Sequence, residues 1–194
     1  MINFTPAEKE KLEAYLVLLK KWQAKINLVS KTTLEDAWQR HILDSAQLLE
    51  VINHDDTPLR LLDLGAGAGF PGMVLAILRP QWSVTLVESD ERKCIFMQTV
   101  SRETEINVRI INERIEDVTP VAVDVVTARA LASLDQLLDY AAPFKAKNPD
   151  LKCVFLKGRR AAEEIEDAQA KHQFEHAEYP SLTDPEAKIV HISF

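Results

Sequence analysis

The sequence predicts an α/β fold in which a mostly parallel β-sheet is covered by helices and follows an N-terminal helical extension. After residue 58, short runs rich in apolar and β-branched residues alternate with segments of helical periodicity, which is the pattern of a parallel sheet. Residues 1–52 show helical periodicity and no strand signal. The 194 residues suffice for one domain with an appendage. We therefore expect an extension over residues 1–58 and a core over residues 59–194.

The first expected helix begins at Pro6. Thr5 can cap this helix, Glu8 can complete a capping box, and proline suits the first helical position. Apolar residues then recur at helical spacing from Leu12 to Ile26. This pattern predicts one amphipathic helix that buries a single face.

A second helix is expected in the rest of the extension. Thr32 with Glu35 has the spacing of another capping box, and an apolar helix face follows it as far as Ile52. His41 lies on that apolar face, so we expect a buried structural histidine. Residues 54–58 have the composition of a linker.

The core should contain strands separated by helices. Ser133 with Gln136 has the spacing of a cap for one of these helices. A last run alternates apolar and polar residues up to the end of the chain, which is typical of a half-buried strand. The expected strands are Leu59–Leu64, Ser83–Val87, Val108–Ile111, Val121–Val126, Lys152–Leu156 and Ala187–Phe194.

The composition indicates a soluble globular protein, with 46% hydrophobic and 27% charged residues. No apolar run reaches the roughly 18 residues that span a bilayer, and the N-terminus does not resemble a signal peptide, so we expect no membrane contact and a cytoplasmic location. The net charge of −7 argues against a general nucleic-acid coat protein but allows a local basic face. Cys94 and Cys153 lie in apolar runs and match no zinc motif, so we predict core residues and no metal site.

The glycines are concentrated in one loop. Four of the five fall within Leu61–Gly72, directly after the first expected strand. Glycine permits positive φ angles and lets a ligand approach the backbone closely. Ligands of open parallel sheets bind at the carboxyl ends of the strands, where this loop lies. The cluster therefore predicts a ligand-binding loop.

The spacing within the loop bears on the ligand. Gly65, Gly67 and Gly69 form G-x-G-x-G, with Asp63 two residues before the first glycine. Glu88 ends the second strand, where a carboxylate can accept both ribose hydroxyls of an adenosine. A dinucleotide motif also fits from Gly67 onward, although proline would then interrupt the start of the helix.

The final alternating run favours one of these ligands. Methyltransferase sheets typically end with an antiparallel seventh strand. We therefore predict a Rossmann-like, class I methyltransferase fold with a mostly parallel seven-stranded sheet, and S-adenosyl-L-methionine as the cofactor. A nicotinamide-binding Rossmann oxidoreductase stays open as an alternative.

Short motifs throughout the chain resemble those of the RsmG (GidB, glucose-inhibited division protein B) family, which are bacterial 16S rRNA guanine-N7 methyltransferases. Their order and spacing are more specific than any single motif. One departure lies in the tail, where Ala187-Lys188 stands at a position that is usually arginine in the family. The matching pieces are Ile26–Leu28, His41–Ser45, Asp63–Gly72, Val87–Ser89, Arg114–Glu116, Ala128–Ala130 and Leu156–Gly158.

The resemblance implies several cofactor contacts. A backbone contact is implied at the first loop glycine, and a pocket wall near the end of the loop. Adenine contacts are implied after the third strand, and a carboxylate contact is implied at the end of the fourth. These contacts are assigned to Gly65, Phe70, Ile115, Glu116 and Arg129. They join Gly67 and Glu88, which the loop and its spacing predict.

The chemistry is indicated partly by motifs that the chain lacks. Enzymes that methylate exocyclic amines usually carry Asp/Asn-Pro-Pro-aromatic after the fourth strand, where this chain has Ala128-Arg129-Ala130. Methylation of pyrimidine C5 needs a nucleophilic cysteine, and Cys153 lies in the middle of an expected strand. A ring nitrogen is therefore the favoured acceptor. Guanine N7 has a lone pair and no proton, so we predict no catalytic side chain and assign catalysis to positioning.

Two basic clusters are candidates for RNA contacts. The second follows the fifth strand at the sheet edge of the cofactor, so we predict RNA binding by Lys157, Arg159 and Arg160. The first cluster is Lys20, Lys21, Lys25 and Lys31. The expected partner is 16S rRNA or the small ribosomal subunit, with no stable protein partner implied. A small-molecule methyltransferase with a helical lid and a non-catalytic cofactor-binding module stay open as alternatives.

Overall fold

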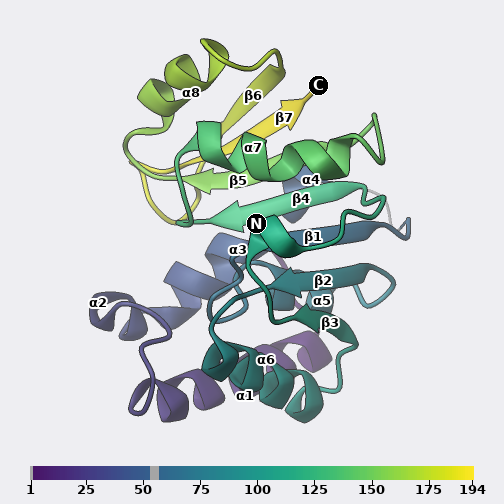
Figure 1. The fold of residues 1–194 in the computed structure, drawn as a ribbon. Helices are drawn as coiled ribbons and strands as arrows, with labels where there is room; N and C mark the ends of the chain where they lie inside the picture. Colours follow the sequence, from purple (N-terminus) through teal and green to yellow (C-terminus); the bar gives the residue numbers. More distant parts are fainter. Residues whose placement is uncertain (1, 53–56) are drawn as a thin grey trace.

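The computed structural model describes residues 2–52 and 57–194, in which seven strands form one sheet in the order β3-β2-β1-β4-β5-β7-β6 (Figure 1). Strands β1 to β5 are parallel, and β7 runs antiparallel to both of its neighbours. The predicted mostly parallel, seven-stranded sheet is therefore confirmed. The strands are β1 (Arg60–Leu64), β2 (Ser83–Val87), β3 (Val108–Ile111), β4 (Val125–Arg129), β5 (Lys152–Lys157), β6 (Glu175–Pro180) and β7 (Lys188–Ser193).

Two strand predictions were wrong. The fourth strand was expected from Val121, but β4 begins at Val125, because Val121 is half exposed and has no partner in the sheet. Strand β6 was not predicted at all. It is an edge strand whose residues are almost all exposed, so it carries no alternating apolar signal.

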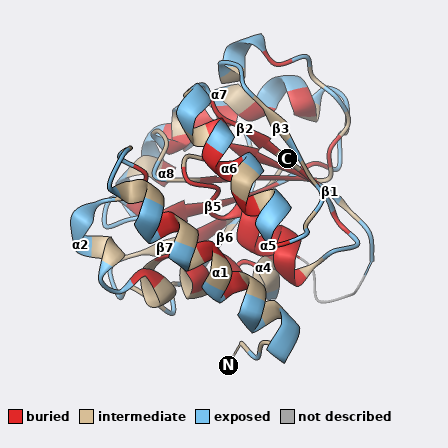
Figure 2. Cartoon of the chain, turned by 90° about the horizontal axis from the view of Figure 1, so that it is seen from below, coloured by how far each residue is buried: buried red, intermediate tan, exposed pale blue. Residues whose placement is uncertain are grey.

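Helices cover both faces of the sheet. Helices α1 (Pro6–Gln23), α5 (Gly72–Leu78) and α6 (Glu91–Glu103) pack on one face, where Leu61 and Leu86 belong to their apolar cluster. Helices α7 (Leu134–Lys145) and α8 (Ala161–Gln169) pack on the other, against the alternate residues Leu62 and Val87. Figure 2 shows the buried residues along the strands and on the inner sides of these helices.

The start of the extension follows the sequence prediction. Thr5 and Glu8 form the expected capping box at the beginning of α1. Leu12 and Leu19 of this helix are fully buried in the same apolar cluster as Met73 of the core. The boundary at residue 58 between the extension and the core stays a prediction, and residues 54–56 of the predicted linker lie outside the described residues.

The second part of the extension differs from the prediction. Ser30, and not Thr32, caps the next helix, because its hydroxyl accepts a hydrogen bond from the Thr33 N–H. Several short helices replace the single helix that was expected. Apolar spacing does not distinguish a π-helical turn from an α-helical one, so the pattern could not show these breaks. The segments are α2 (Lys31–Leu34), the π-helical η1 (Trp38–Leu43), α3 (Asp44–Ala46) and α4 (Leu49–Ile52).

Among the described residues, no helix is both long and apolar enough to cross a membrane.

Candidate active site

A cavity of about 940 Å³ lies at the carboxyl ends of the parallel strands. The glycine loop after β1, Glu88 after β2 and Ile115 after β3 line one part of it. The end of β5 and the η1 turn of the extension line another part. The sheet topology thus brings all of the predicted cofactor residues to one cavity: Gly65, Gly67, Phe70, Glu88, Ile115, Glu116 and Arg129.

The buried carboxylate of Asp63 holds the glycine loop. It accepts one hydrogen bond from the Gly72 N–H and one from the Thr127 hydroxyl, each at 2.9 Å. Burial raises the pKa of Asp63 to about 7, although both hydrogen bonds act in the opposite direction. Asp63 therefore ties β1 to the start of α5 and to β4, and has a structural role beneath the loop.

The loop leaves space for a ligand at one glycine. Gly65 and Gly67 both have φ near +60°, a conformation that favours glycine. A Cβ atom at Gly65 would lie 2.5 Å from the Leu131 side chain, whereas one at Gly67 would have only the Gly65 carbonyl oxygen nearby, at 3.8 Å. The backbone at Gly67 is therefore open to a ligand in the cavity.

Glu88 connects β2 to this loop. One carboxylate oxygen accepts the Gly67 N–H at 2.9 Å, and the other accepts the Asp90 N–H at 2.8 Å. The side chain is almost fully buried and lines the cavity. Because each carboxylate oxygen can accept a further hydrogen bond, Glu88 keeps the capacity to bind ligand hydroxyls.

The residues after β3 line the cavity beside Glu88. Ile115 begins a short 3₁₀ helix, η2 (Ile115–Asp117), which places Glu116 next to it. The Glu116 carboxylate is exposed and accepts a hydrogen bond from the Tyr140 hydroxyl at 3.2 Å. Tyr140 of α7 was not singled out from the sequence, since the contact joins residues 24 positions apart.

Phe70 lies between two other rings. Its centroid is 5.0 Å from that of Tyr15 and 4.8 Å from that of His41, with interplanar angles of 13° and 18°. The Arg129 guanidinium also lies 5.0 Å from the Phe70 centroid. The Tyr15 hydroxyl donates a hydrogen bond to the Ala68 carbonyl. Two residues of the extension thus form the support of the glycine loop.

His41 is buried, as predicted from its helix face. Burial, with the nearby charges of Arg129 and Arg40, lowers the pKa of His41 to about 3, so the ring is neutral at physiological pH. Its Nε2 lies 3.1 Å from the Thr33 hydroxyl, while Nδ1 has no hydrogen-bond partner among the described residues. His41 therefore packs against Phe70 as an uncharged ring.

Arg129 ends β4 and lines the cavity. Its guanidinium donates to the Arg40 carbonyl at 3.1 Å and to the Asp44 carboxylate at 3.4 Å. Asp44 also accepts from the Thr183 hydroxyl at 2.5 Å and from the Gln47 amide at 2.9 Å. The sequence left the role of Asp44 open. The structure shows that Asp44 joins the extension, the end of β4 and the loop before β7.

The predicted RNA-binding cluster does not form one exposed surface. Lys157 is buried, and its ammonium lies 2.5 Å from Glu164. Arg159 and Arg160 are exposed and paired with Glu186 and Glu163. The prediction that Lys157 contacts RNA phosphates is wrong, because Lys157 ends a strand with its side chain buried against α8. The arginines follow in the turn, and their RNA contacts stay a prediction.

Neither cysteine is placed as a nucleophile. Cys153 is fully buried in β5, and burial raises the pKa of its thiol well above the usual range. Burial also raises the pKa of Cys94 to about 11. Both thiols are therefore protonated and inert at neutral pH, as expected for core residues.

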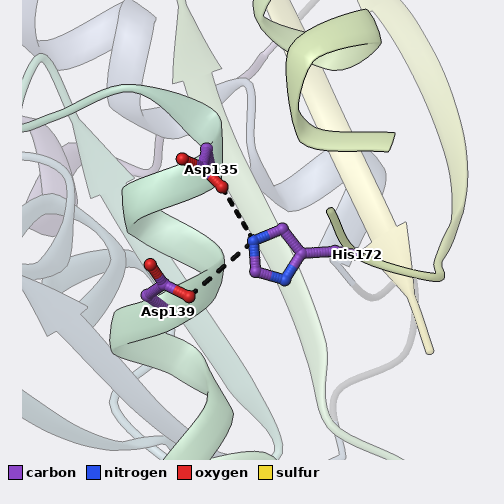
Figure 3. Close-up of side chains that lie close together, drawn as sticks. All are labelled: Asp135, Asp139 and His172. Carbon is purple, nitrogen blue, oxygen red and sulfur yellow. Dashed lines mark hydrogen bonds and ion pairs between the residues drawn. The ribbon is translucent and has the colours of Figure 1, made fainter. Parts of the chain in front are cut away.

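One cluster of possible metal ligands lies outside the cavity (Figure 3). His172 Nε2 is 2.9 Å from Asp135 and 3.7 Å from Asp139. The other carboxylate oxygen of Asp135 binds the Lys171 ammonium at 2.6 Å. These contacts explain the cluster without a metal ion: Asp135 and Asp139 of α7 pair with the basic residues that follow α8.

Comparison with known proteins identifies the family. Residues 8–192 match the model of the GidB family, described as rRNA small subunit methyltransferase G. This chain belongs to that family. A methyltransferase G of Paramagnetospirillum magneticum is 50% identical over 94% of this chain and 87% of its own length. A methyltransferase G of Rhodospirillum rubrum is 48% identical over 94% of this chain and 89% of its own length.

Solved methyltransferase structures share the fold of this chain. The magnesium protoporphyrin IX methyltransferase of Synechocystis, solved with SAH, superposes with a TM-score of 0.64 at 12% identity, covering 95% of this chain and 98% of that one. The ribosomal protein L11 methylase of Lactobacillus delbrueckii superposes with a TM-score of 0.61 at 17% identity, covering 77% and 75%. The predicted class I methyltransferase fold is confirmed.

Membership of the methyltransferase G family decides between the alternatives that the sequence left open. The chain is an S-adenosylmethionine-dependent rRNA methyltransferase, and the nicotinamide oxidoreductase and the small-molecule methyltransferase are excluded at the level of the family. The extension also packs beneath the glycine loop through Tyr15 and His41, and this arrangement is that of a support and not of a separate lid.

Proposed function

We propose that this enzyme transfers the methyl group of S-adenosylmethionine to N7 of a guanine in 16S rRNA. The observation that supports the proposal most strongly is the cavity at the carboxyl ends of the strands. One half of the cavity is lined by the glycine loop and Glu88, which suit an adenosine. The other half lies at the ends of β4 and β5. Neither an amine-methylating motif nor a reactive cysteine lies in that second half.

The residues present fit the proposed cofactor. The open backbone at Gly67 and the glycine conformation at Gly65 allow the methionine part and the ribose to approach closely. The Glu88 carboxylate would accept the ribose hydroxyls, since its oxygens retain accepting capacity. These three residues would fix the centre of the cofactor.

The two ends of the cofactor would meet other residues. Ile115 would flank the adenine, and Glu116 would accept a hydrogen bond from its amino group. Phe70 would wall the pocket, and Arg129 would bind the carboxylate of the methionine part through donors that Asp44 and the Arg40 carbonyl leave free. The sulfonium of the bound cofactor makes its methyl group electrophilic.

No protein base is needed for this reaction. Guanine N7 attacks with its in-plane lone pair, so no proton has to be removed from the acceptor. His41 and the two cysteines would serve poorly as bases, because His41 is a buried, very weak base and the thiols are buried in the core. The protein contributes by aligning N7 with the carbon–sulfur bond and by excluding water.

The RNA would be held mainly through phosphate contacts. Arg159 and Arg160 are exposed and directly follow Gly158, which lines the cavity, so their guanidinium groups can exchange carboxylate partners for phosphates near its rim. A guanine in a helical region must be unstacked to reach the cavity, so the substrate is a loop or a partly assembled subunit. Such a substrate places the enzyme in the cytoplasm with the assembling ribosome.

Transfer of labelled methyl groups tests this function directly. The protein is incubated with labelled S-adenosylmethionine and either 16S rRNA or small subunits, with 23S rRNA as the control. We expect incorporation into one of the two small-subunit substrates and none into 23S rRNA. The absence of transfer to both 16S substrates would contradict the proposal and would favour a binding module without catalysis.

A further inference from the structure

We propose that Lys157 and Glu164 recognise the guanine beside N7, with Lys157 donating to O6 and Glu164 accepting from N1–H. This inference rests on the proposed function and names the residues that select the base. Both residues line the same cavity as the cofactor residues. Neither role follows from the sequence, which placed Lys157 among phosphate contacts.

The sheet order separates the two halves of the cavity. Apart from Arg129 at the end of β4, the cofactor residues follow β1, β2 and β3, which lie on one side of β4, and β5 lies on its other side. Lys157 ends β5, and Glu164 lies in the first turns of α8. An acceptor base that shares the cavity with the cofactor therefore enters over the ends of β4 and β5, where this pair lies.

The contacts of the pair leave one donor and one acceptor available. The Lys157 ammonium donates to the Ala132 carbonyl at 2.7 Å and to Glu164 Oε2 at 2.5 Å, so two of its three protons are used. Glu164 Oε2 also accepts from the Leu134 N–H at 2.9 Å. No group among residues 2–52 and 57–194 bonds to Glu164 Oε1.

The pair is held more firmly than a surface ion pair. The exposed fractions of the two side chains are 7% for Lys157 and 18% for Glu164. Each also bonds to the backbone of the segment after β4, at Ala132 and Leu134. Burying a charged pair in the wall of the cavity costs desolvation free energy, and an apolar pair in the same place would not have this cost. A role in binding a polar ligand explains why charges are kept there.

Guanine matches this arrangement and adenine does not. Guanine has an acceptor at O6 and a donor at N1, whereas adenine has a donor at the exocyclic amine and an acceptor at N1. Adenine would therefore direct a donor at the ammonium and a lone pair at the carboxylate. Partly buried polar groups without partners disfavour binding strongly, so the pair selects guanine over adenine.

The same carboxylate would favour the transition state. As the N7–carbon bond forms and the carbon–sulfur bond breaks, the cofactor loses its positive charge and the guanine ring gains one, with no proton transferred. The Glu164 carboxylate beside N1–H lies where this charge develops. The Lys157 ammonium donates to O6 and leaves the N7 lone pair free for the methyl group.

Nucleotide inhibition of methyl transfer to the rRNA substrate tests the selection. GMP and IMP, which share O6 and N1–H, should inhibit at similar concentrations. AMP and N1-methyl-GMP should require concentrations at least about fivefold higher. This factor corresponds to the lower end of the discrimination expected from two hydrogen bonds to one base. Equal inhibition by all four nucleotides, or no inhibition up to their solubility limits, would overturn the inference.

A charge-neutral variant provides the second test. Glu164→Gln should lower kcat/KM for the rRNA by about tenfold or more and abolish the preference for GMP over AMP, while SAH affinity stays unchanged. The matched control is Glu166→Gln, since Glu166 is an exposed glutamate two positions further along α8. Unchanged kcat/KM and an unchanged preference in a folded Glu164→Gln variant would overturn the inference.

These outcomes separate this inference from the function on which it rests. If the wild-type enzyme methylates N7 but shows no guanine preference, only the roles of Lys157 and Glu164 are wrong. If it methylates another atom, the proposed function fails first. Should Glu164→Gln fail to fold, the nucleotide series on the wild-type protein still decides the question.

Discussion

The ring of Tyr15 lies parallel to the ring of Phe70, with 5.0 Å between the centroids and 13° between the planes. Tyr15 belongs to the first helix of the extension, and Phe70 belongs to the glycine loop. The Tyr15 hydroxyl also donates to the carbonyl of Ala68 in the same loop. The extension therefore fixes the position of the loop that we propose holds the cofactor.

Removal of the Tyr15 hydroxyl should weaken that support. Tyr15→Phe keeps the ring contact with Phe70 but leaves the Ala68 carbonyl without its side-chain donor. We expect the free energy of unfolding to fall by about 1–3 kcal/mol, as for other buried polar groups that lose a partner. Urea unfolding measures this change, and calorimetry should show weaker S-adenosylmethionine binding. Tyr179→Phe, at an exposed tyrosine, is the control; equal effects of the two substitutions would count against the account.

Gly67→Ala should affect the ligand more than the fold. The left-handed backbone at this position costs an alanine about 1–2 kcal/mol, but the added Cβ meets no protein atom closer than 3.8 Å. We expect a folded variant in which S-adenosylmethionine affinity falls about tenfold or more, because the methyl group occupies space meant for the ligand. Calorimetry measures the S-adenosylmethionine affinity of Gly67→Ala. Gly158→Ala is the control, because a Cβ at Gly158 meets no atom within 4 Å. Wild-type affinity in folded Gly67→Ala would remove Gly67 from the site.

Asp63 should make stability depend on pH. Burial raises its pKa in the folded protein to about 7, above the ordinary value of 3.8, so the folded state holds this proton between these pH values and the unfolded state does not. The contribution of Asp63 is therefore fully present below about pH 4 and is lost as the pH rises through 7.

Asp63→Asn isolates this contribution. Asparagine can accept the Gly72 N–H through its oxygen and donate to the Thr127 hydroxyl, so the contacts can be kept. Between pH 5 and pH 8, the wild-type protein should lose about 2–3 kcal/mol more unfolding free energy than the variant. Urea unfolding at both pH values measures the difference. Parallel pH profiles for the two proteins would show that Asp63 does not titrate in this range.

Arg159 and Arg160 should contribute to the salt dependence of RNA binding. Replacing both with alanine should reduce the slope of log affinity against log salt concentration by about 0.7–0.9 for each lost phosphate contact. S-adenosylmethionine affinity should stay the same. Arg102→Ala serves as the control, because Arg102 is an exposed, acid-paired arginine on α6. A slope that the double substitution leaves unaltered would mean that these arginines bind only their glutamates.

Local patterns predicted the parts of the site that depend on local geometry. The glycine loop after β1 and Glu88 at the end of β2 were predicted because strand, turn and helix follow one another within about thirty residues, as in other nucleotide-binding units. Strand β7 was predicted from simple alternation, and its antiparallel direction was expected from what is typical of methyltransferase sheets. His41 was correctly expected to be buried, since its helix face is apolar.

Contacts between distant residues could not be predicted in this way. Tyr15 supports the loop from 53 residues away, and Asp44 joins Thr183 across 139 positions. Lys157 was expected in an exposed basic run, because spacing alone does not show that Glu164 approaches it from α8. The exposed edge strand β6 gave no alternation that would reveal it. In each case the missing information is the packing of one element on another.

The position of the transferred methyl group tests the central claim most directly. The 16S substrate is methylated by the wild-type enzyme, treated with borohydride and then aniline, and the cleavage sites are mapped by primer extension. N7 methylation puts a positive charge on the guanine ring and makes the chain cleavable there, so we predict cleavage at one guanine that depends on both enzyme and S-adenosylmethionine. Incorporation of the methyl group without such cleavage, on an exocyclic amine, a ribose oxygen or a pyrimidine carbon, would contradict the account.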